Sequence, residues 1–305
     1  MKTWQKLGLV ITPMGYPWAM SHAQNPAAEH REGSVYRVYF SPRDERNRAG
    51  AAWADIDVEH PERGMLDHSR QSLLELGRPG AFDDCGVMPH CVVEAGGAHH
   101  MFYTGWSLAK VVPFTFFIGL ARSHDGGKTF GRVSEAPVLG RNRHDPFLTA
   151  APWVILENGL WRMWYISGSH WELVEGDQPK HYYRIKYAES DDGETWRPVA
   201  VAVDFEDDEY AIARPVVTRT ARGYEMWFCS RGGDGTYRPR HATSPDGLDW
   251  TRTPGDTGID VSESGWDSDM VCYPFVFSHG DKQYMLYNGN GYGRDGAGLA
   301  VRDLG

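Results

Sequence analysis

Short runs of alternating apolar and polar residues fill this chain, and one kind of run returns at a nearly fixed interval. In each repeat a proline precedes an apolar stretch, a turn with glycine or charged residues follows, and a stretch rich in aromatic residues comes next. Alternation with a period of two in aromatic and β-branched residues predicts β-strands. By subtraction, the repeats lie 63, 63, 63 and 59 residues apart, at Pro26, Pro89, Pro152, Pro215 and Pro274. Such regular spacing predicts tandem supersecondary units.

Each unit continues with a third strand, an Asp-Gly turn and a fourth strand. Four antiparallel strands repeated five times predict an all-β fold, a five-bladed β-propeller with four-stranded blades. The fifth unit stops after its third strand, "GAGLAVRDL", while "KTWQKLGLVI" at 2–11 is similar to the fourth strand of another unit, "ETWRPVAVAV". We therefore expect the N-terminal strand to close the ring, which removes an exposed sheet edge. Residues 1–305 then form a single propeller domain.

The turn before the fourth strand reads "SHDGGKTF", "SDDGETW" and "SPDGLDW" in three of the units. Repeated acidic loops can bind calcium or can be structural turns, and the repeat favours the second. We expect Asp125, Asp192 and Asp246 to accept hydrogen bonds from backbone amides, as in the loops called Asp boxes. The following glycines would supply positive φ angles. The aromatic residues expected to pack between blades are Phe130, Trp196 and Trp250.

Composition and charge narrow the function. The 305 residues are 41% hydrophobic and carry a net charge of −10, with no basic run. This argues against nucleic acid or an anionic membrane as the main partner. The four cysteines are scattered and form no CxxC pair, which predicts reduced thiols in a cytoplasmic protein. The apolar stretch at the N-terminus is too short for a signal peptide. We expect no cofactor, because no ligand cluster calls for a divalent ion in the central channel.

Candidate site residues follow from propeller geometry, because the first strand of a blade starts, and the second ends, on the same face. Asp84 and Asp269 stand five positions before their prolines, with Glu209 one residue and Asp145 two residues off that position. We predict these four as catalytic carboxylates, one a protonated acid with a raised pKa and another the base or nucleophile. The residues predicted to contact the substrate are Asn25, His90, Trp106, Arg214, Arg231, Tyr273 and Asn288.

Each of these residues also has a structural explanation. An aspartate before a strand is most often an Asx-turn or a cap to a loop amide. His90 can be a hydrogen-bonded structural histidine, and Trp106 can be part of the blade packing. Arg214 can simply neutralise Glu209. A functional role for the group is favoured because blades two, four and five all place ionisable residues at one level of the funnel.

The chain resembles the five-bladed propeller superfamily of glycoside hydrolases, with families 32, 43, 68, 117 and 130. The repeat, the Asp-Gly loops and the ring closure carry this resemblance over almost the whole chain, and "YMLYNGNGYGRDGAGLA", "MFYTGW" and "RMWYISG" are similar to family-32-like proteins. The resemblance implies cleavage of a glycosidic bond by a carboxylate pair. Three positions depart from the family pattern. Asn25 stands where families 32 and 43 have an aspartate nucleophile or base, and Cys91 stands where family 43 has an aspartate. Ala150 stands where both families have the glutamate that acts as the acid.

The sequence therefore predicts a glycoside hydrolase that acts on a carbohydrate with a set of carboxylates of its own. Two alternatives stay open, a carbohydrate-binding propeller without catalysis and a glycoside phosphorylase or transglycosidase. Arg214 and Arg231 would suit an acidic or heavily hydroxylated sugar. The third unit contains a long segment, "SGSHWELVEGDQPKHYY", that we expect to be a loop, which either shapes one side of the pocket or mediates a dimer. The oligomeric state is not assigned.

Overall fold

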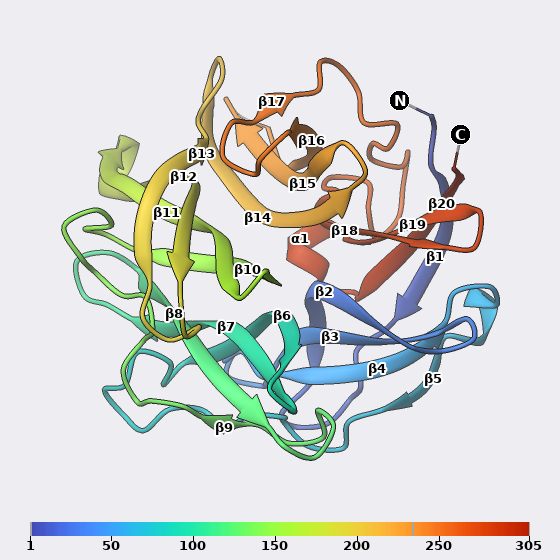
Figure 1. Cartoon of the computed structure of the whole chain (residues 1–305), viewed down its shortest axis with the longest axis horizontal. Helices are drawn as coiled ribbons and strands as arrows, with labels where there is room; N and C mark the ends of the chain where they lie inside the picture. Colours follow the sequence, from blue (N-terminus) through green and yellow to red (C-terminus); the bar gives the residue numbers. More distant parts are fainter. Residues whose placement is uncertain (1, 234, 305) are drawn as a thin grey trace.

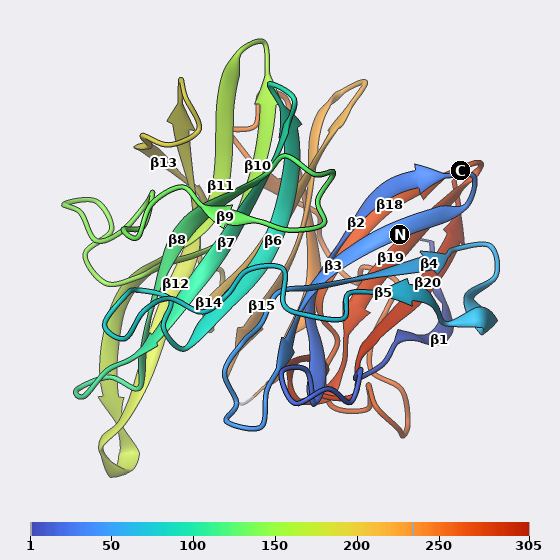
Figure 2. The same cartoon turned by 90° about the horizontal axis from the view of Figure 1, so that it is seen from below.

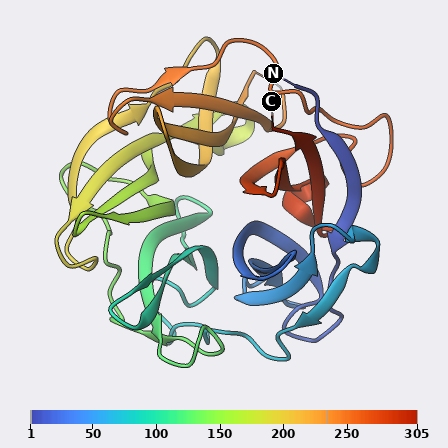
Figure 3. The same cartoon turned by 45° about the vertical axis from the view of Figure 1, so that its right-hand side comes forward.

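The structure is a computed structural model that describes residues 2–233 and 235–304. Its strands form a ring of four-stranded antiparallel blades, and Figure 3 looks approximately along the axis of that ring. Among the described residues, no helix has both the length and the apolar character needed to cross a membrane. The ring of blades confirms the five-bladed propeller that the repeat predicts.

In blades 1 to 4, chain order gives the strands from the centre outward (Figure 1). Blades 1 and 2 consist of β2 (Ser21–Glu32), β3 (Val35–Arg43), β4 (Ala52–Asp57) and β5 (Met65–His68), then β6 (Gly86–Ala95), β7 (Ala98–Leu108), β8 (Phe114–Ser123) and β9 (Gly131–Arg132). Blade 3 consists of β10 (Thr149–Glu157), β11 (Leu160–Val174), β12 (Gln178–Ser190) and β13 (Arg197–Val203). Blade 4 consists of β14 (Glu209–Thr220), β15 (Gly223–Gly232), β16 (Arg238–Ser244) and β17 (Thr251–Arg252).

Blade 5 joins the two ends of the chain. It consists of β18 (Cys272–His279), β19 (Lys282–Asn288), β20 (Ala297–Asp303) and β1 (Gln5–Ile11). The outer strand β1 pairs antiparallel with β20, from Gln5 opposite Val301 to Ile11 opposite Ala297, and the blue and red strands lie side by side in Figure 1. The predicted ring closure is confirmed. The helical turns are η1 (Pro61–Arg63), η2 (Glu175–Asp177) and α1 (Asn290–Gly293).

Two lengths differ from the prediction. The fourth strands of blades 2 and 4 have only two residues each. The long segment of the third unit is no loop. It extends β11 and β12 into a hairpin, whose tip projects beyond the ring in Figure 2.

The repeated proline marks a β-bulge in every inner strand. The register shifts between Gln24 and Ala27 in blade 1 and at the matching place in blades 3, 4 and 5, whereas in blade 2 it shifts one residue later, between Pro89 and Cys91. In four blades the residue before the proline has a positive φ: 58° at Asn25, 48° at Ala151, 57° at Arg214 and 54° at Tyr273. This conformation is uncommon for residues other than glycine, and a following proline restricts it further. A bulge of this kind bends the strand and re-aims a side chain.

Blades 2, 3 and 5 each contain a buried carboxylate near the start of the inner strand. Each accepts a hydrogen bond from a tyrosine of the second strand, at 2.9 to 3.0 Å, in the pairs Asp83–Tyr103, Asp145–Tyr165 and Asp267–Tyr287. Each also pairs with a cation, at 2.8, 2.9 and 2.7 Å, in Arg132–Asp83, Lys186–Asp145 and Lys6–Asp267. Burial and the adjacent carboxylate raise the pKa of all three tyrosines, which stay protonated donors. Hydrogen-bonded charge pairs therefore fasten the strands of a blade to one another.

The three Asp-Gly loops have the hydrogen bonds predicted from the sequence. Asp125, Asp192 and Asp246 each accept two backbone amides, at 2.7 to 3.0 Å. The glycines that follow have φ angles of 76°, 76° and 82°. The aromatic residue after each loop contacts the preceding blade edge-on, at ring distances of 6.4, 5.9 and 6.3 Å, in the pairs Phe130–Tyr39, Trp196–Phe102 and Trp250–Trp164.

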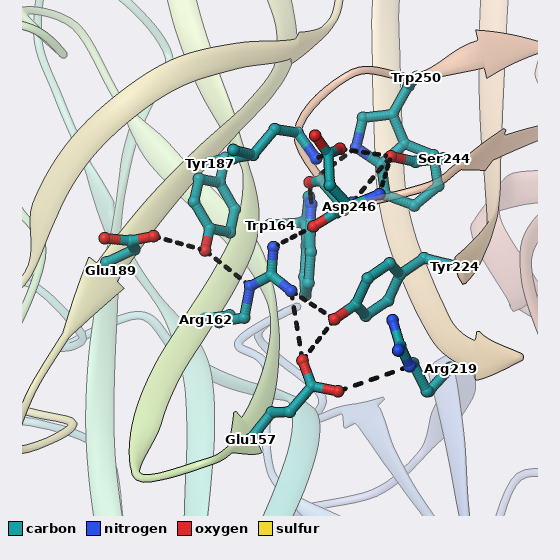
Figure 4. Close-up of polar contacts among 12 residues, drawn as sticks. Glu157, Arg162, Trp164, Tyr187, Glu189, Arg219, Tyr224, Ser244, Asp246 and Trp250 are labelled. Carbon is teal, nitrogen blue, oxygen red and sulfur yellow. Dashed lines mark hydrogen bonds and ion pairs between the residues drawn. The ribbon is translucent and has the colours of Figure 1, made fainter. Parts of the chain in front are cut away.

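Blades 3 and 4 show how such a loop is held by its neighbour (Figure 4). Arg162 of β11 donates to the carbonyl oxygen of Asp246 and to the phenol of Tyr224, both in blade 4. Trp164 donates its indole N–H to the carbonyl oxygen of Gly247 at 2.9 Å. Backbone carbonyls of the loop thus bind side chains of the preceding blade, and the carboxylate binds the loop itself.

Replacement of Asp145 by asparagine tests the buried clusters. We expect it to lower the free energy of unfolding by about 3–5 kcal/mol, because Lys186 loses its buried counter-charge. Urea unfolding followed by tryptophan fluorescence measures the loss. The matched control is Asp191→Asn, which breaks an exposed ion pair with Arg197 and is expected to cost less than about 1 kcal/mol. Equal losses in the two variants would contradict the structural role.

Acid conditions test the Asp-Gly loops. The amides of Thr195 and Glu194 lower the pKa of the Asp192 carboxyl below its ordinary value. Such a group stabilises the fold above its unfolded-state pKa of about 4, and this stabilisation is lost as pH falls through the lower folded-state value. We expect Asp192→Asn to destabilise the protein at neutral pH and the gap to wild type to shrink as pH falls below about 4. Urea titrations at several pH values measure the gap, and a constant gap would show that the charge is unimportant.

Candidate functional site

The inner strands of all five blades meet at a cavity of about 270 Å³. This volume lies close to the lower end of the range for small-molecule sites, about 300–1,000 Å³. Every inner strand contributes to the wall the residue before its repeated proline, in blade order Asn25, Met88, Ala151, Arg214 and Tyr273. The four residues held at a positive φ before these prolines thus converge, together with Met88, on one small cavity.

Buried side chains hold these bulges in place across blade boundaries. Asn288 of blade 5 is fully buried; its amide oxygen accepts the backbone N–H of Asn25 at 2.9 Å, and its amide nitrogen donates to the carbonyl oxygen of Ala23 at 2.8 Å. Thr104 of blade 2 accepts the backbone N–H of Ala151 at 2.9 Å. The wall of the cavity is therefore fixed before any ligand enters.

Aromatic rings form much of the wall. Trp106 at the end of β7 is half-buried, packs edge-on against Phe116, and its indole N–H has no hydrogen-bond partner among the described residues. Tyr292 of α1 stacks on Tyr273 with ring centres 6.3 Å apart. Aromatic faces beside free polar donors are typical of sites that bind ligands with both apolar and polar surfaces.

The charged groups of the wall are all basic. Arg43, Arg214 and Arg231 line the cavity together with two histidines, and no aspartate or glutamate within 2–233 or 235–304 does so. Burial lowers the pKa of Arg43 and of Arg214 to about 10, so both stay protonated at neutral pH.

The two histidines of the wall are neutral at physiological pH. Burial, and then the charge of Arg214, lower the pKa of His90 well below its ordinary value. Burial and Arg231 lower that of His181 to about 4. His90 Nε2 lies 2.9 Å from the hydroxyl of Thr104. Neutral imidazoles can donate or accept a hydrogen bond without adding charge to the cavity.

Six of the seven residues predicted to contact a substrate line this cavity: Asn25, His90, Trp106, Arg214, Arg231 and Tyr273. Their role in binding stays a prediction. The seventh, Asn288, lies behind the wall and supports the bulge at Asn25. Arg214 does not neutralise Glu209.

The four predicted catalytic carboxylates do not converge on the cavity. Asp145 is fully buried in the cluster with Lys186, and Glu209 forms two hydrogen bonds of 2.7 Å with Arg252. Asp84 accepts the backbone N–H of Gly80 at 2.9 Å, and the Asp269 side chain is exposed. None of the four carboxyl groups lines the cavity, and local hydrogen bonds and ion pairs hold those of Asp84, Asp145 and Glu209 elsewhere. Their catalytic role has no support from their positions.

The pKa of Glu209 also differs from the raised pKa expected of a protonated catalytic acid. Burial raises the pKa of Glu209, but the two hydrogen bonds and the charge of Arg252 outweigh burial, and the pKa lies below its ordinary value. Glu209 is therefore ionised at neutral pH. It cannot be the protonated acid with a raised pKa that the sequence suggested.

Sequence reasoning missed the residues that the third strands supply. Phe116, Tyr183 and Tyr237 all line the cavity. Each stands seven positions before the serine of the Asp-Gly loop in its blade, so the loop motif could have located them. His181 was missed for another reason, since it comes from the segment of blade 3 that was read as a loop. The hairpin formed by this segment shapes one side of the cavity, one of the two roles left open above.

Solved structures share this fold. A complex of BT0996 with RGII matches with a TM-score of 0.78 and 19% identity, over 99% of this chain and 92% of the other. A thermostable family-43 glycoside hydrolase matches with a TM-score of 0.65 and 16% identity, over 92% and 88% of the two chains. The β-1,2-mannobiose phosphorylase from Listeria innocua gives a TM-score of 0.66 and 12% identity, over 97% and 94%. The fold is thus shared with glycoside hydrolases and a phosphorylase.

Sequence comparison places the chain more narrowly. No protein-family model matches it. Two curated relatives from Mycobacterium tuberculosis, "Uncharacterized protein MT1551" of strain CDC 1551 / Oshkosh and "Uncharacterized protein Rv1502" of strain ATCC 25618 / H37Rv, are each 44% identical over 301 residues. The match covers 98% of this chain and 98% of each relative. The chain therefore belongs to the family of these two mycobacterial proteins.

Proposed function

We propose that this protein is a carbohydrate-binding propeller whose central cavity holds one sugar unit. The observation that carries the proposal is the composition of the cavity wall, which combines aromatic faces and polar donors but has no carboxylate from the described residues. Hydrolysis by a carboxylate pair needs two carboxyl groups that flank the glycosidic bond, about 5 to 9.5 Å apart. The wall offers a binding surface without that pair.

The wall suits a sugar in several ways. A pyranose or furanose ring has an apolar face, which can pack on Trp106 or Tyr292, and a rim of hydroxyl groups. The free indole N–H of Trp106 and the side-chain amide of Asn25 can bond such hydroxyls, since neither has a hydrogen-bond partner among the described residues. A polar site that is preformed loses little entropy when its ligand binds.

The position of Asn25 favours binding over hydrolysis. By the resemblance stated above, families 32 and 43 have an aspartate at this place, directly before the proline of blade 1. Asn25 is 4% exposed, has a positive φ and lines the cavity. An amide donates and accepts hydrogen bonds, but it can serve neither as nucleophile nor as base. The geometry of a sugar site is thus retained without the group that would attack the sugar.

Calorimetric titration with a panel of neutral and charged monosaccharides and their methyl glycosides tests sugar binding. We expect saturable binding, and about three- to tenfold weaker binding by Trp106→Phe, because the ligand loses one hydrogen bond. The matched control is Trp53→Phe. Trp53 also lies under an arginine, with Arg37 3.7 Å from its ring centre against 4.4 Å for Arg43 over Trp106, but it is outside the cavity. Equal weakening in both variants would count against the cavity as the site.

Sugar release from a panel of glycosides tests the hydrolase alternative. We expect no turnover by the wild type, and unchanged sugar affinity in Asp84→Asn, Glu209→Gln and Asp269→Asn, because these side chains do not line the cavity. Circular dichroism checks that each variant is folded. Turnover by the wild type that collapses in at least two folded variants would overturn the proposal and identify a glycoside hydrolase.

A further inference from the structure

Three arginines of the cavity wall have no carboxylate partner among the described residues. Elsewhere, arginines and lysines with little solvent exposure are paired, as in Arg37–Asp55, Arg132–Asp83, Lys186–Asp145 and Arg252–Glu209. The chain has 41 acidic and 31 basic residues, so counter-charges are abundant. The structure forms no ion pair to Arg43, Arg214 or Arg231 within 2–233 and 235–304, although all three lie around one cavity.

Arg214 is the most unusual of the three. It is fully buried, and its Nη2 donates to the carbonyl oxygens of Pro26 at 2.9 Å and Asn25 at 3.3 Å. Its Nε and Nη1 have no hydrogen-bond partner among the described residues. A buried guanidinium has five N–H donors, and unmet donors on a buried charge are strongly unfavourable. Its backbone is also strained, with a φ of 57° before a proline. Features that destabilise the free protein persist at sites where a ligand compensates for them.

Arg43 and Arg231 are held by neutral groups, so their charges stay free for a ligand. Arg43 donates to the amide oxygen of Gln24 at 2.9 Å and lies over Trp106. Arg231 lies 3.3 Å from the phenol of Tyr292, and its guanidinium carbon is 4.7 Å from the ring centre of Tyr237. The Nε of each has no partner among the described residues. Neutral partners fix the direction of a guanidinium without cancelling its charge.

We infer that the sugar bound in the cavity is anionic, a monosaccharide unit that carries a carboxylate or a phosphate group, and that Arg214 binds this group with Arg43 and Arg231 beside it. The inference rests on the proposed sugar-binding function and names the class of ligand. Guanidinium groups bind carboxylate and phosphate oxygens in the same geometry, through paired N–H donors. The cavity of about 270 Å³ limits the ligand to one such unit. The neutral histidines and the phenols of the wall remain for its hydroxyl groups.

The closing experiment compares four probes by calorimetry: glucuronic acid, glucose 1-phosphate, glucose and inorganic phosphate. We expect one of the two anionic sugars to bind about 10- to 100-fold more tightly than glucose, and Arg214→Met to remove this advantage. The matched control is Arg184→Met, which removes one positive charge outside the cavity, from an ion pair with Asp204. The preference between the uronate and the sugar phosphate identifies the anionic group.

Thermal unfolding keeps the variant interpretable. Without ligand, Arg214→Met should melt at the wild-type temperature or above it, since it replaces an unpaired buried charge with an apolar side chain. The anionic sugar should raise the melting temperature of wild type and not that of the variant. If Arg214→Met does not fold, Arg43→Gln takes its place, with the same loss of the anionic preference expected.

The outcomes separate this inference from the function on which it rests. Equal affinity for glucose and for both anionic sugars would contradict the inference that the ligand is anionic. The proposed sugar-binding function would be unaffected. Tight binding of inorganic phosphate, with no gain from the sugar, would overturn the sugar-binding function and this inference together. The same holds if none of the four probes binds.

Discussion

The bulge before the repeated proline is the constraint on which the rest of the structure depends. In each blade it turns one residue of the inner strand toward the axis, and in four blades it holds that residue at a positive φ that ordinary side chains avoid. Such a conformation persists only where its surroundings impose it. Asn288 imposes it on Asn25 of blade 1, and Thr104 imposes it on Ala151 of blade 3. The contacts that close the ring and those that shape the cavity are therefore the same contacts.

The ring, its closure and the Asp-Gly loops could be predicted from sequence because each leaves a local or periodic mark. The proline recurs at one place in the blade, so the intervals of 63, 63, 63 and 59 residues are visible without any structure. The same regularity located three residues of the cavity wall, Asn25, Arg214 and Tyr273, because they stand directly before their prolines. Positions fixed by backbone geometry are the ones that a repeat reveals.

The carboxylates could not be placed from sequence because position along a strand does not give the direction of a side chain. Asp145 stands close to the first strand of its blade, yet Tyr165 and Lys186, from two later strands, direct it into the blade. Asp83, 62 residues earlier, accepts a hydrogen bond from Tyr103 in the same way, so the recurring aspartate holds the strands of its blade together. A repeat of acidic residues thus has a structural cause here. Pairing partners distant in sequence decide which charges stay buried in pairs and which remain free.

The pairing of Gln5 with Val301 has a consequence for how the chain folds. Contacts between residues so far apart in sequence carry a large loop-closure entropy, and they form late. Until β1 meets β20, both strands expose unpaired backbone groups, which are templates for association with other chains. During synthesis blade 5 can assemble only after β20 has left the ribosome. The ring closure that protects the finished molecule from aggregation thus leaves its folding intermediates exposed to it.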